Sequence, residues 1–152
     1  MPKIDIASLP VRKSSAYPDQ FKPVCAGREK TPLGNGADLT QFGVNLTRIK
    51  PGSASALRHW HAIEDEFIYL LEGELVLVED GGETVLKPGD CAGFKANVAN
   101  GHNLVNRSDR DAVYLEIGTR SKVERVTYPD DDLYIDRDEK HVKILHKDGT
   151  PY

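Results

Sequence analysis

Three histidines and one glutamate in the middle of the chain have the chemistry and the spacing of a metal site. His59 and His61 are two positions apart, Glu66 follows five positions later, and His102 lies further along the chain. Residues i and i+2 of an extended strand project from the same face, so the two neighbouring imidazoles can reach one point. Imidazole nitrogens combined with a carboxylate oxygen favour transition metals over calcium or magnesium. The four residues therefore predict a site for one divalent transition metal: Zn, Fe, Mn or Ni.

The neighbours of Glu66 and His102 indicate that both side chains lie inside the protein. Glu66 has the same parity as Ile68 and Leu70 in an expected strand, and His102 has the parity of Leu104. A carboxylate buried among apolar side chains without a partner costs several kcal/mol. A metal cation is the simplest partner that satisfies the carboxylate and the imidazoles together, and it would keep coordination positions open for water, oxygen or a substrate.

The same residues allow other interpretations. The histidines could lie by chance on a surface strand, with Glu66 in an ordinary ion pair. Glu64 or Asp65 could replace Glu66 as the acidic ligand, although Asp65 has the opposite parity and Glu64 falls in the expected turn. The remaining histidines, His141 and His146, have no acidic residue in register, so we expect them on the surface.

Other polar residues could transfer protons beside the metal or bind a substrate. Tyr114 and Glu116 are the candidates for a catalytic acid and base, with Tyr69 as a third candidate, although such residues also fill cores or orient ligands. Arg58 should point away from the histidines, where it either packs on the outer surface or clamps a phosphate or carboxylate at the mouth of a barrel. We expect Asn106 to be a structural hydrogen-bonding residue.

Short strands separated by turns must position these residues. Strands are expected at 42–46, 67–71, 75–78, 84–86, 91–94, 102–106 and 112–117, with one or two more around 142–145. Turns are marked by Pro51–Gly52 and Pro88–Gly89, and Glu72–Gly73 is a hairpin signal between 67–71 and 75–78. A spacing of roughly 8 to 12 residues without intervening helices is typical of a sandwich or a closed barrel.

Two segments carry a family resemblance. The run Gly52, His59–Trp60–His61, Glu66 and Gly73 resembles the first motif of the cupins, and Gly89–Asp90, His102 and Asn106 resemble the second, with Lys95 where cupins usually have proline. The resemblance implies an all-β, cupin-type double-stranded β-helix, that is, a jelly-roll barrel with an extended N-terminal arm. It also implies that His59, His61, Glu66 and His102 bind the metal.

The resemblance divides the chain into three parts. These are an N-terminal arm with short strands over 1–38, a barrel core over 39–120, and a C-terminal extension over 121–152 that packs on the barrel. Longer runs, including 41–46 and 146–152, look like a bacterial branch of single-domain cupins, some of which are called sugar-phosphate isomerases. This implies a metal-dependent enzyme for a small polar metabolite, with isomerase, dioxygenase or lyase chemistry. The alternative is a non-catalytic module that binds a small ligand.

Composition excludes several classes of function and partner. The 152 residues carry a net charge of −4 without a basic stripe, which argues against nucleic acid as a partner. No apolar run approaches the ~20 residues of a membrane helix, and no signal segment is visible, so we expect a cytoplasmic protein without a membrane partner. Cys25 and Cys91 should be reduced and buried. The apolar arm and the exposed strand edges need cover, which predicts a homodimer.

Overall fold

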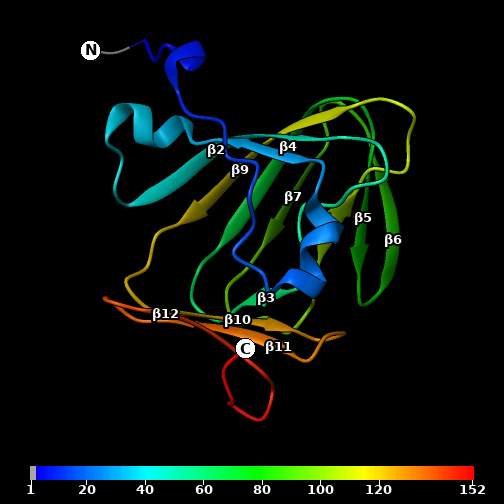
Figure 1. The fold of residues 1–152 in the computed structure, drawn as a ribbon. Coiled ribbons are helices and arrows are strands. Elements are labelled where there is room, and N and C mark those ends of the chain that lie inside the picture. The colour runs from blue at the N-terminus through cyan, green and yellow to red at the C-terminus, as the bar shows by residue number, and fades with distance from the viewer. Residues whose placement is uncertain (1–2) are drawn as a thin grey trace.

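The computed structural model describes residues 3–152, which form mainly β-strands with three short 3-10 helices among them (Figure 1). The helices are η1 (Ile6–Ser8), η2 (Asp19–Cys25) and η3 (Leu33–Ala37). The strands are β1 (Arg28–Thr31), β2 (Phe42–Ile49), β3 (Trp60–His61), β4 (Glu66–Glu72), β5 (Leu75–Glu79), β6 (Gly82–Leu86), β7 (Cys91–Phe94), β8 (Asn103–Val105), β9 (Ala112–Thr119), β10 (Glu124–Tyr128), β11 (Leu133–Arg137) and β12 (Val142–Leu145). The all-β architecture expected from the sequence is confirmed. No helix in the described range is long and apolar enough to cross a membrane.

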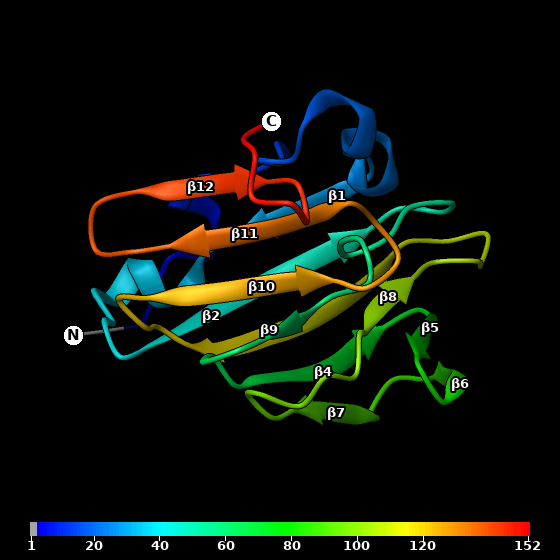
Figure 2. The same cartoon turned by 90° about the horizontal axis from the view of Figure 1, so that it is seen from below.

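Three antiparallel sheets surround the interior. The largest has the order β1-β2-β9-β4-β7, the second β12-β11-β10-β3, and the third β6-β5-β8. The order is not the chain order, because neighbouring strands such as β2 and β9 come from distant parts of the sequence, as in a jelly roll. Figure 2 shows β10, β11 and β12 side by side along one side of the large sheet.

Strand alternation decides which side chains enter the barrel. On β4, Ile68 and Leu70 are buried, whereas Phe67, Tyr69 and Leu71 are exposed on the outer face. The inward side chains join a core of aliphatic residues from both larger and smaller sheets: Ile49, Leu75, Leu77, Leu86, Leu104 and Ala112. Burial of each large aliphatic side chain contributes about 1.5–3 kcal/mol, so this core holds the sheets in one register.

The expected hairpin at Glu72–Gly73 is wrong. β4 belongs to the large sheet and β5 to the three-stranded sheet, so the chain crosses from one sheet to the other at this point. Gly73 has φ +78°, and a Cβ there would lie 2.5 Å from the backbone oxygen of Asp111. The glycine therefore serves a left-handed turn against a neighbouring chain segment, and a glycine signal cannot show whether the flanking strands pair.

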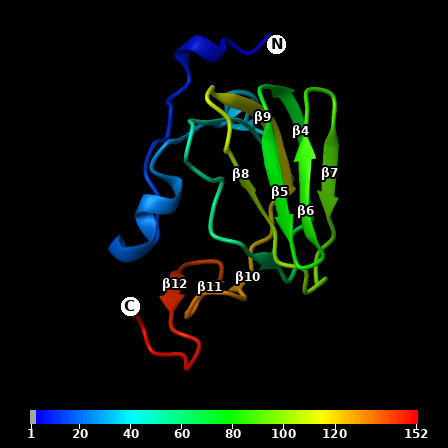
Figure 3. The ribbon, with the colours of Figure 1, turned by 90° about the vertical axis from the view of Figure 1, so that its right-hand side faces the viewer.

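The N-terminal segment packs on its own chain only in part. Tyr17 is buried and meets the ring of Tyr128 edge to face, with centroids 5.7 Å apart, whereas Ile6 and Val11 remain exposed. Figure 3 shows the segment running along one side of the barrel until η2 reaches the level of the C-terminal strands. The expected arm begins at residue 1, but residues 1 and 2 lie outside the described range.

The sequence interpretation missed β10 and β11. Both strands are rich in charged residues, so their inward positions are hard to recognise by alternation, although β12 coincides with the expected strand at 142–145. β10 pairs with β3, where Val126 opposes His61, so this late strand flanks one of the candidate ligands. Of the two cysteines, both are free and Cys25 is buried, but Cys91 is exposed because its parity on β7 turns it outward.

Candidate metal centre

The four candidate ligands come from separate segments that the sheets bring together. His59 and His102 face each other across an isolated bridge, in which each backbone amide donates to the other residue's carbonyl at 3.1 and 2.9 Å. His61 lies on β3, and Glu66 begins β4 on its inward face. Residues up to 43 positions apart thus point into one interior space.

Three imidazole Nε2 atoms converge on one carboxylate oxygen. The distance to Oε2 of Glu66 is 3.0 Å for His102, 3.3 Å for His61 and 4.0 Å for His59. Ligand atoms bound to one transition metal at about 2.1 Å lie roughly 3 Å from one another. His59, His61 and Glu66 also form a group whose ligand atoms all lie within 4.8 Å. The spacing of His59, His61 and Glu66 fits one metal ion, whereas His102 contacts Glu66 but is not part of this compact group.

The other ring nitrogen of each histidine points away from the centre. Nδ1 of His59 lies 2.8 Å from the Leu57 carbonyl, Nδ1 of His61 lies 3.5 Å from Oε2 of Glu124, and Nδ1 of His102 lies 3.4 Å from the Asn100 carbonyl. Acceptors at Nδ1 fix the tautomer that leaves Nε2 free as a ligand. The surroundings therefore orient the imidazoles of His59 and His102 as metal binding requires, and Glu124 is the group nearest to Nδ1 of His61.

Glu124 is a residue that sequence reasoning missed. It lies on β10, is only 4% exposed, and its carboxylate accepts hydrogen bonds from the backbone amides of Ala62, Ile63 and Glu64 at 2.7 to 3.1 Å. These bonds fix the turn between β3 and β4, while the same carboxylate faces His61. Nothing in the sequence distinguishes Glu124 from the exposed acidic residues of the C-terminal part, because its role arises from the β3–β10 pairing.

The charges of the centre depend on its burial. Burial disfavours the ionised form of Glu66, but the hydrogen bond with His102 and the nearby His61 imidazole outweigh it and hold the pKa of Glu66 well below its usual range. Burial lowers the pKa of His59 to about 4, so this imidazole is neutral at pH 7. Both ring nitrogens of His61 are buried, and within residues 3–152 neither has a partner in hydrogen-bond geometry. A buried carboxylate beside unsatisfied imidazole nitrogens is an environment that a cation would complete.

The rival acidic ligands are occupied elsewhere. Glu64 pairs with Arg137 and accepts the Ser121 amide at 2.7 Å, and Asp65 accepts the Ala96 amide at 2.8 Å. A second group, His61 with Glu64 and Glu124, is also compact enough to hold an ion. The carboxylates of Glu64 and Glu124 already have backbone or arginine partners, however. Among the described residues, the partners of the Glu66 carboxylate are imidazoles alone.

A cavity of about 300 Å³ connects the ligands to polar residues of β1 and β9. Lys30 donates to Oε1 of Glu116 at 2.6 Å and Asn45 donates to the same oxygen at 3.2 Å, while the Tyr114 hydroxyl donates to Oε2 at 3.2 Å. Tyr114 and Glu116 therefore face the same interior as the candidate ligands. Burial, and then the negative charge of Glu116, raises the pKa of Tyr114 well above its usual value, so Tyr114 stays protonated.

A second cavity, of about 200 Å³, reaches the centre from another side and is lined by Trp60, His61, Lys95 and His102 among others. Phe94 borders both cavities, and its ring stacks on that of His102 with centroids 3.6 Å apart. The stacking restricts rotation of the His102 imidazole and places an apolar ring beside the ligand atoms.

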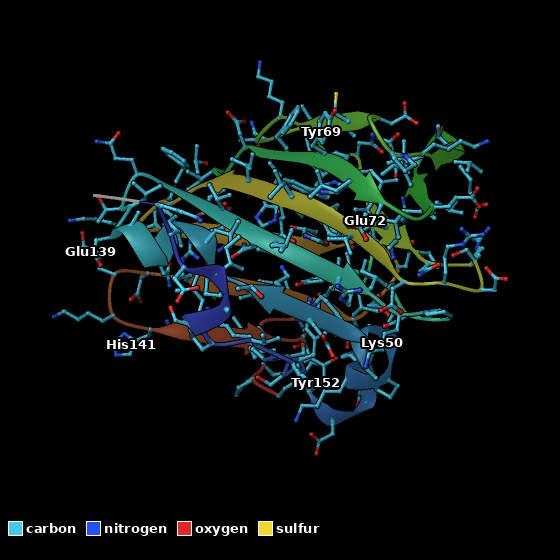
Figure 4. The ribbon with its side chains drawn as sticks, turned by 90° about the horizontal axis from the view of Figure 1, so that it is seen from above. Lys50, Tyr69, Glu72, Glu139, His141 and Tyr152 are labelled. Carbon is cyan, nitrogen blue, oxygen red and sulfur yellow. The ribbon has the colours of Figure 1, made fainter. Side chains whose placement is uncertain are left out.

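The remaining candidates lie away from the centre. Tyr69 is 39% exposed on the outer face of the large sheet, as Figure 4 shows, so it cannot act inside. Arg58 pairs with Asp130 at 2.7 Å and also with Asp80, which holds it across the outside of the barrel. Arg58 therefore forms two ion pairs within the chain. It is neither an arginine that only packs on the outer surface nor one that is free to clamp a phosphate or carboxylate.

The expectation that His141 and His146 lack acidic partners is wrong. Nδ1 of His146 lies 2.8 Å from Asp132, and Nδ1 of His141 lies 3.4 Å from Asp138. These pairs form because β11 and β12 are antiparallel neighbours, and that pairing was not predicted. Asn106, in contrast, is the structural hydrogen-bonding residue expected: it is fully buried and donates to the carbonyls of Ile49 and Arg110, both at 2.8 Å.

The chain is similar to known proteins in both sequence and fold. Residues 45–118 match the model of the Cupin domain family. A crystal structure of a sugar phosphate isomerase from a cupin superfamily, from Silicibacter pomeroyi, is 44% identical, covers 99% of this chain and 96% of its own, and has a TM-score of 0.96. No curated protein matches.

More distant structures share the architecture. A protein from Acidithiobacillus ferrooxidans, provisionally named a sugar phosphate isomerase, is 28% identical over 84% of this chain and 83% of its own, with a TM-score of 0.77. The polyketide cyclase RemF from Streptomyces resistomycificus is 18% identical over 78% of this chain and 79% of its own, with a TM-score of 0.63. At 18% identity the likeness extends to the fold alone.

Proposed function

The chain belongs to the cupin superfamily, and from this premise we propose that it is a metal-dependent enzyme that isomerises a small polar metabolite. The observation that carries the proposal is the convergence of three Nε2 atoms on Oε2 of Glu66 beside a cavity with a carboxylate on its opposite wall. His59, His61, Glu66 and His102 would hold one divalent ion, Zn, Fe, Mn or Ni. Isomerase chemistry is favoured over dioxygenase or lyase chemistry because a 44% identical protein is named a sugar phosphate isomerase.

A bound divalent cation would polarise a carbonyl oxygen of the substrate. Isomerisation between an aldose and a ketose then requires a base that removes a proton from the adjacent carbon and returns it to the former carbonyl carbon, while the hydroxyl proton on that adjacent carbon moves to the former carbonyl oxygen. Glu116 is our candidate for this base, because Lys30 and Asn45 occupy its Oε1 and only the Tyr114 hydroxyl contacts its Oε2. Glu116 lines the cavity, and its Oε2 has fewer hydrogen-bond donors than its Oε1.

Tyr114 and Lys30 position this base. The two donors approach Glu116 from different strands and fix the plane of its carboxylate. Since Tyr114 stays protonated, it acts as a hydrogen-bond donor that can follow the charge on Glu116 as the proton moves. A non-catalytic binding module would not need a charged carboxylate held by three donors in its ligand cavity.

The test is proton exchange in heavy water. Protein loaded in turn with each metal is incubated with aldose and ketose phosphates, and NMR detects interconversion and deuterium at the exchanging carbon. Glu116→Gln should reduce turnover by about 10²-fold or more. The matched control is Glu83→Gln, because Glu83 is paired only with Arg107 on the surface. Metal-loaded protein that binds these sugars without exchange or turnover would favour the binding module instead.

We also propose that two copies associate through the outer face of the large sheet. Phe67, Tyr69 and Leu71 project from β4 with 39–40% exposure, and Cys91 lies beside them on the neighbouring strand β7. Contiguous exposed apolar side chains of this kind mark interaction surfaces. Light scattering at two concentrations should give a dimer, and Leu71→Glu should convert it to a monomer. A monomer of the unmodified protein at both concentrations would contradict the proposal.

A further inference from the structure

Two basic residues of β1 face the interior cavity. Arg28 pairs in register with Ile49 and Lys30 with Thr47, and both partners are fully buried. Directly opposed residues of antiparallel strands project from the same face, so Arg28 and Lys30 also point inward. Both side chains line the cavity that holds the candidate metal ligands.

The two cations differ in how their charge is balanced. Lys30 is neutralised by Glu116 at 2.6 Å. The guanidinium of Arg28 donates to the backbone carbonyl of Ser55, and within residues 3–152 it has no carboxylate partner. Removing a charge from water without a counter-ion is costly, and an arginine fork in a cavity is suited to a bidentate oxyanion. Arg28 is therefore a cation with unused donors at a solvent-accessible cavity.

The surroundings of Arg28 include an unused acceptor as well. Asn103 lines the same cavity, its Nδ2 donates to the Ala56 carbonyl at 3.0 Å, and its Oδ1 is buried with no hydrogen-bond partner. Buried polar atoms are almost always satisfied in native structures, so this oxygen is available for a donor from a ligand. A positive charge and a buried, unsatisfied acceptor on two residues that line one cavity suit a ligand that carries both an anionic group and a hydroxyl.

We propose that Arg28 binds the anionic group of a small polyhydroxylated substrate while Asn103 accepts a hydrogen bond from one of its hydroxyls. A role for this site in substrate specificity rests on the proposed function. Binding of the anion by Arg28 does not depend on that function. The cavity of about 300 Å³ has room for about ten water molecules, which suits a sugar phosphate or a sugar acid. Phosphate and carboxylate offer the same oxyanion chemistry to the guanidinium.

The test compares three probes that share a hexose skeleton: glucose 6-phosphate, gluconate and neutral glucose. Calorimetry gives their dissociation constants with the intact protein, both metal-loaded and after treatment with a chelator. The preferred anion should bind at least 10-fold more tightly than glucose, and Arg28→Gln should weaken it by about 10- to 100-fold while leaving glucose unchanged. Whichever of the two anions has the lower dissociation constant identifies the anionic group as phosphate or carboxylate.

Arg48→Gln is the matched control. Arg48 lies on β2, next to β1, but it pairs with Asp111 on the outer surface, so its substitution should leave the ratio of the constants unchanged. Arg28→Lys retains the charge without the fork and should give an intermediate ratio. A merely structural Arg28 would alter thermal stability but not the preference for anions over glucose.

Two outcomes would overturn the proposal: an unchanged anion preference in folded Arg28→Gln protein, or no anion binding by the unmodified protein. If Arg28→Gln does not fold, the arginine Nε–H signals of the unmodified protein decide, since the Arg28 signal must shift on addition of the preferred anion. The proposed function fails separately, through absence of metal or turnover. The anion preference of chelator-treated protein can then still be measured, because Arg28 is not among the candidate ligands.

Discussion

Histidine side chains contact carboxylates in two regions of this molecule, the barrel interior and the C-terminal strands, and the two regions differ in burial. In the barrel, three imidazoles surround Glu66, and their side chains are 7–15% exposed. In the C-terminal strands, His146 faces Asp132 at 2.8 Å, with side-chain exposures of 32% and 62%, and the His146 ring stacks on Tyr152. Figure 4 labels Tyr152 and His141 on the outside of the molecule.

The difference shows that convergence and burial, not the pairing itself, make a candidate metal centre. An exposed ion pair contributes about 0–1 kcal/mol and is well solvated in the absence of any ligand. The buried group has several ligand atoms around one oxygen and too few protons and partners to satisfy all of them. Binding of a cation is therefore expected to be strongly favourable in the barrel and only weakly favourable at the surface.

The largest expected effect concerns metal content. Protein purified without chelators or a nickel column should contain stoichiometric metal, and His59→Ala with His61→Ala should abolish it, because half of the ligands are lost. His141→Ala with His146→Ala removes two imidazoles from the exposed region and should leave the metal content unchanged. Elemental analysis measures both. Equal metal loss in the two double variants would remove the distinction between the regions.

Chelation should produce the next largest effect. A ligand present at 100 times its dissociation constant stabilises the folded state by about 2.7 kcal/mol, which corresponds to roughly 5 to 10 °C in a domain of this size. Calorimetry should therefore show a melting temperature lowered by about this amount after removal of metal from the unmodified protein. The His59→Ala, His61→Ala variant should not respond to chelator, and a response of equal size would place the stabilising ion elsewhere.

Glu124→Gln tests whether the surroundings of the ligands contribute. The carboxylate faces Nδ1 of His61, and loss of such a partner typically weakens metal binding by about 10- to 100-fold. A competition titration with a coloured chelator measures the constant. Asp132→Asn is the control, because it removes the corresponding carboxylate from His146 at the surface. Unchanged metal affinity in Glu124→Gln would show that His61 needs no orienting partner.

The smallest effect is the pH dependence of the exposed region. Hydrogen bonds from the Lys147 amide and from His146 hold the pKa of Asp132 below its usual value. The ionised Asp132 carboxylate therefore stabilises the folded state in full above its unfolded-state pKa of about 3.9. This stabilisation is lost as the pH falls through the lower folded-state pKa. Asp132→Asn should lower the melting temperature slightly at pH 7, and the difference from the unmodified protein should disappear in strong acid. A constant difference at all pH values would contradict this assignment.

Much of the candidate site was predictable because its signal is local. Spacing placed His59 and His61 on one face, and parity placed Glu66 with Ile68 and Leu70, as β4 shows. The strand expected at 91–94 coincides with β7, and the late strand expected around 142–145 coincides with β12. The same reasoning failed at Glu72–Gly73, because a turn signal carries no information about which strands pair afterwards. It failed at Cys91 because the residue types of β7 do not reveal which face is covered.

The spacing of His59 and His61, the parity of Glu66 and the motifs that resemble cupins were readable from the amino-acid sequence, since each is a local pattern of residues. Three relations became visible in the folded chain alone: Glu124 lies beside His61, Lys30 neutralises Glu116, and Arg28 has no counter-ion among the described residues. Each of these relations joins segments 60 or more residues apart or depends on the absence of a partner anywhere in the described chain. Such relations arise from the order of strands in the sheets, which the non-local packing of the core selects and no short window of sequence encodes.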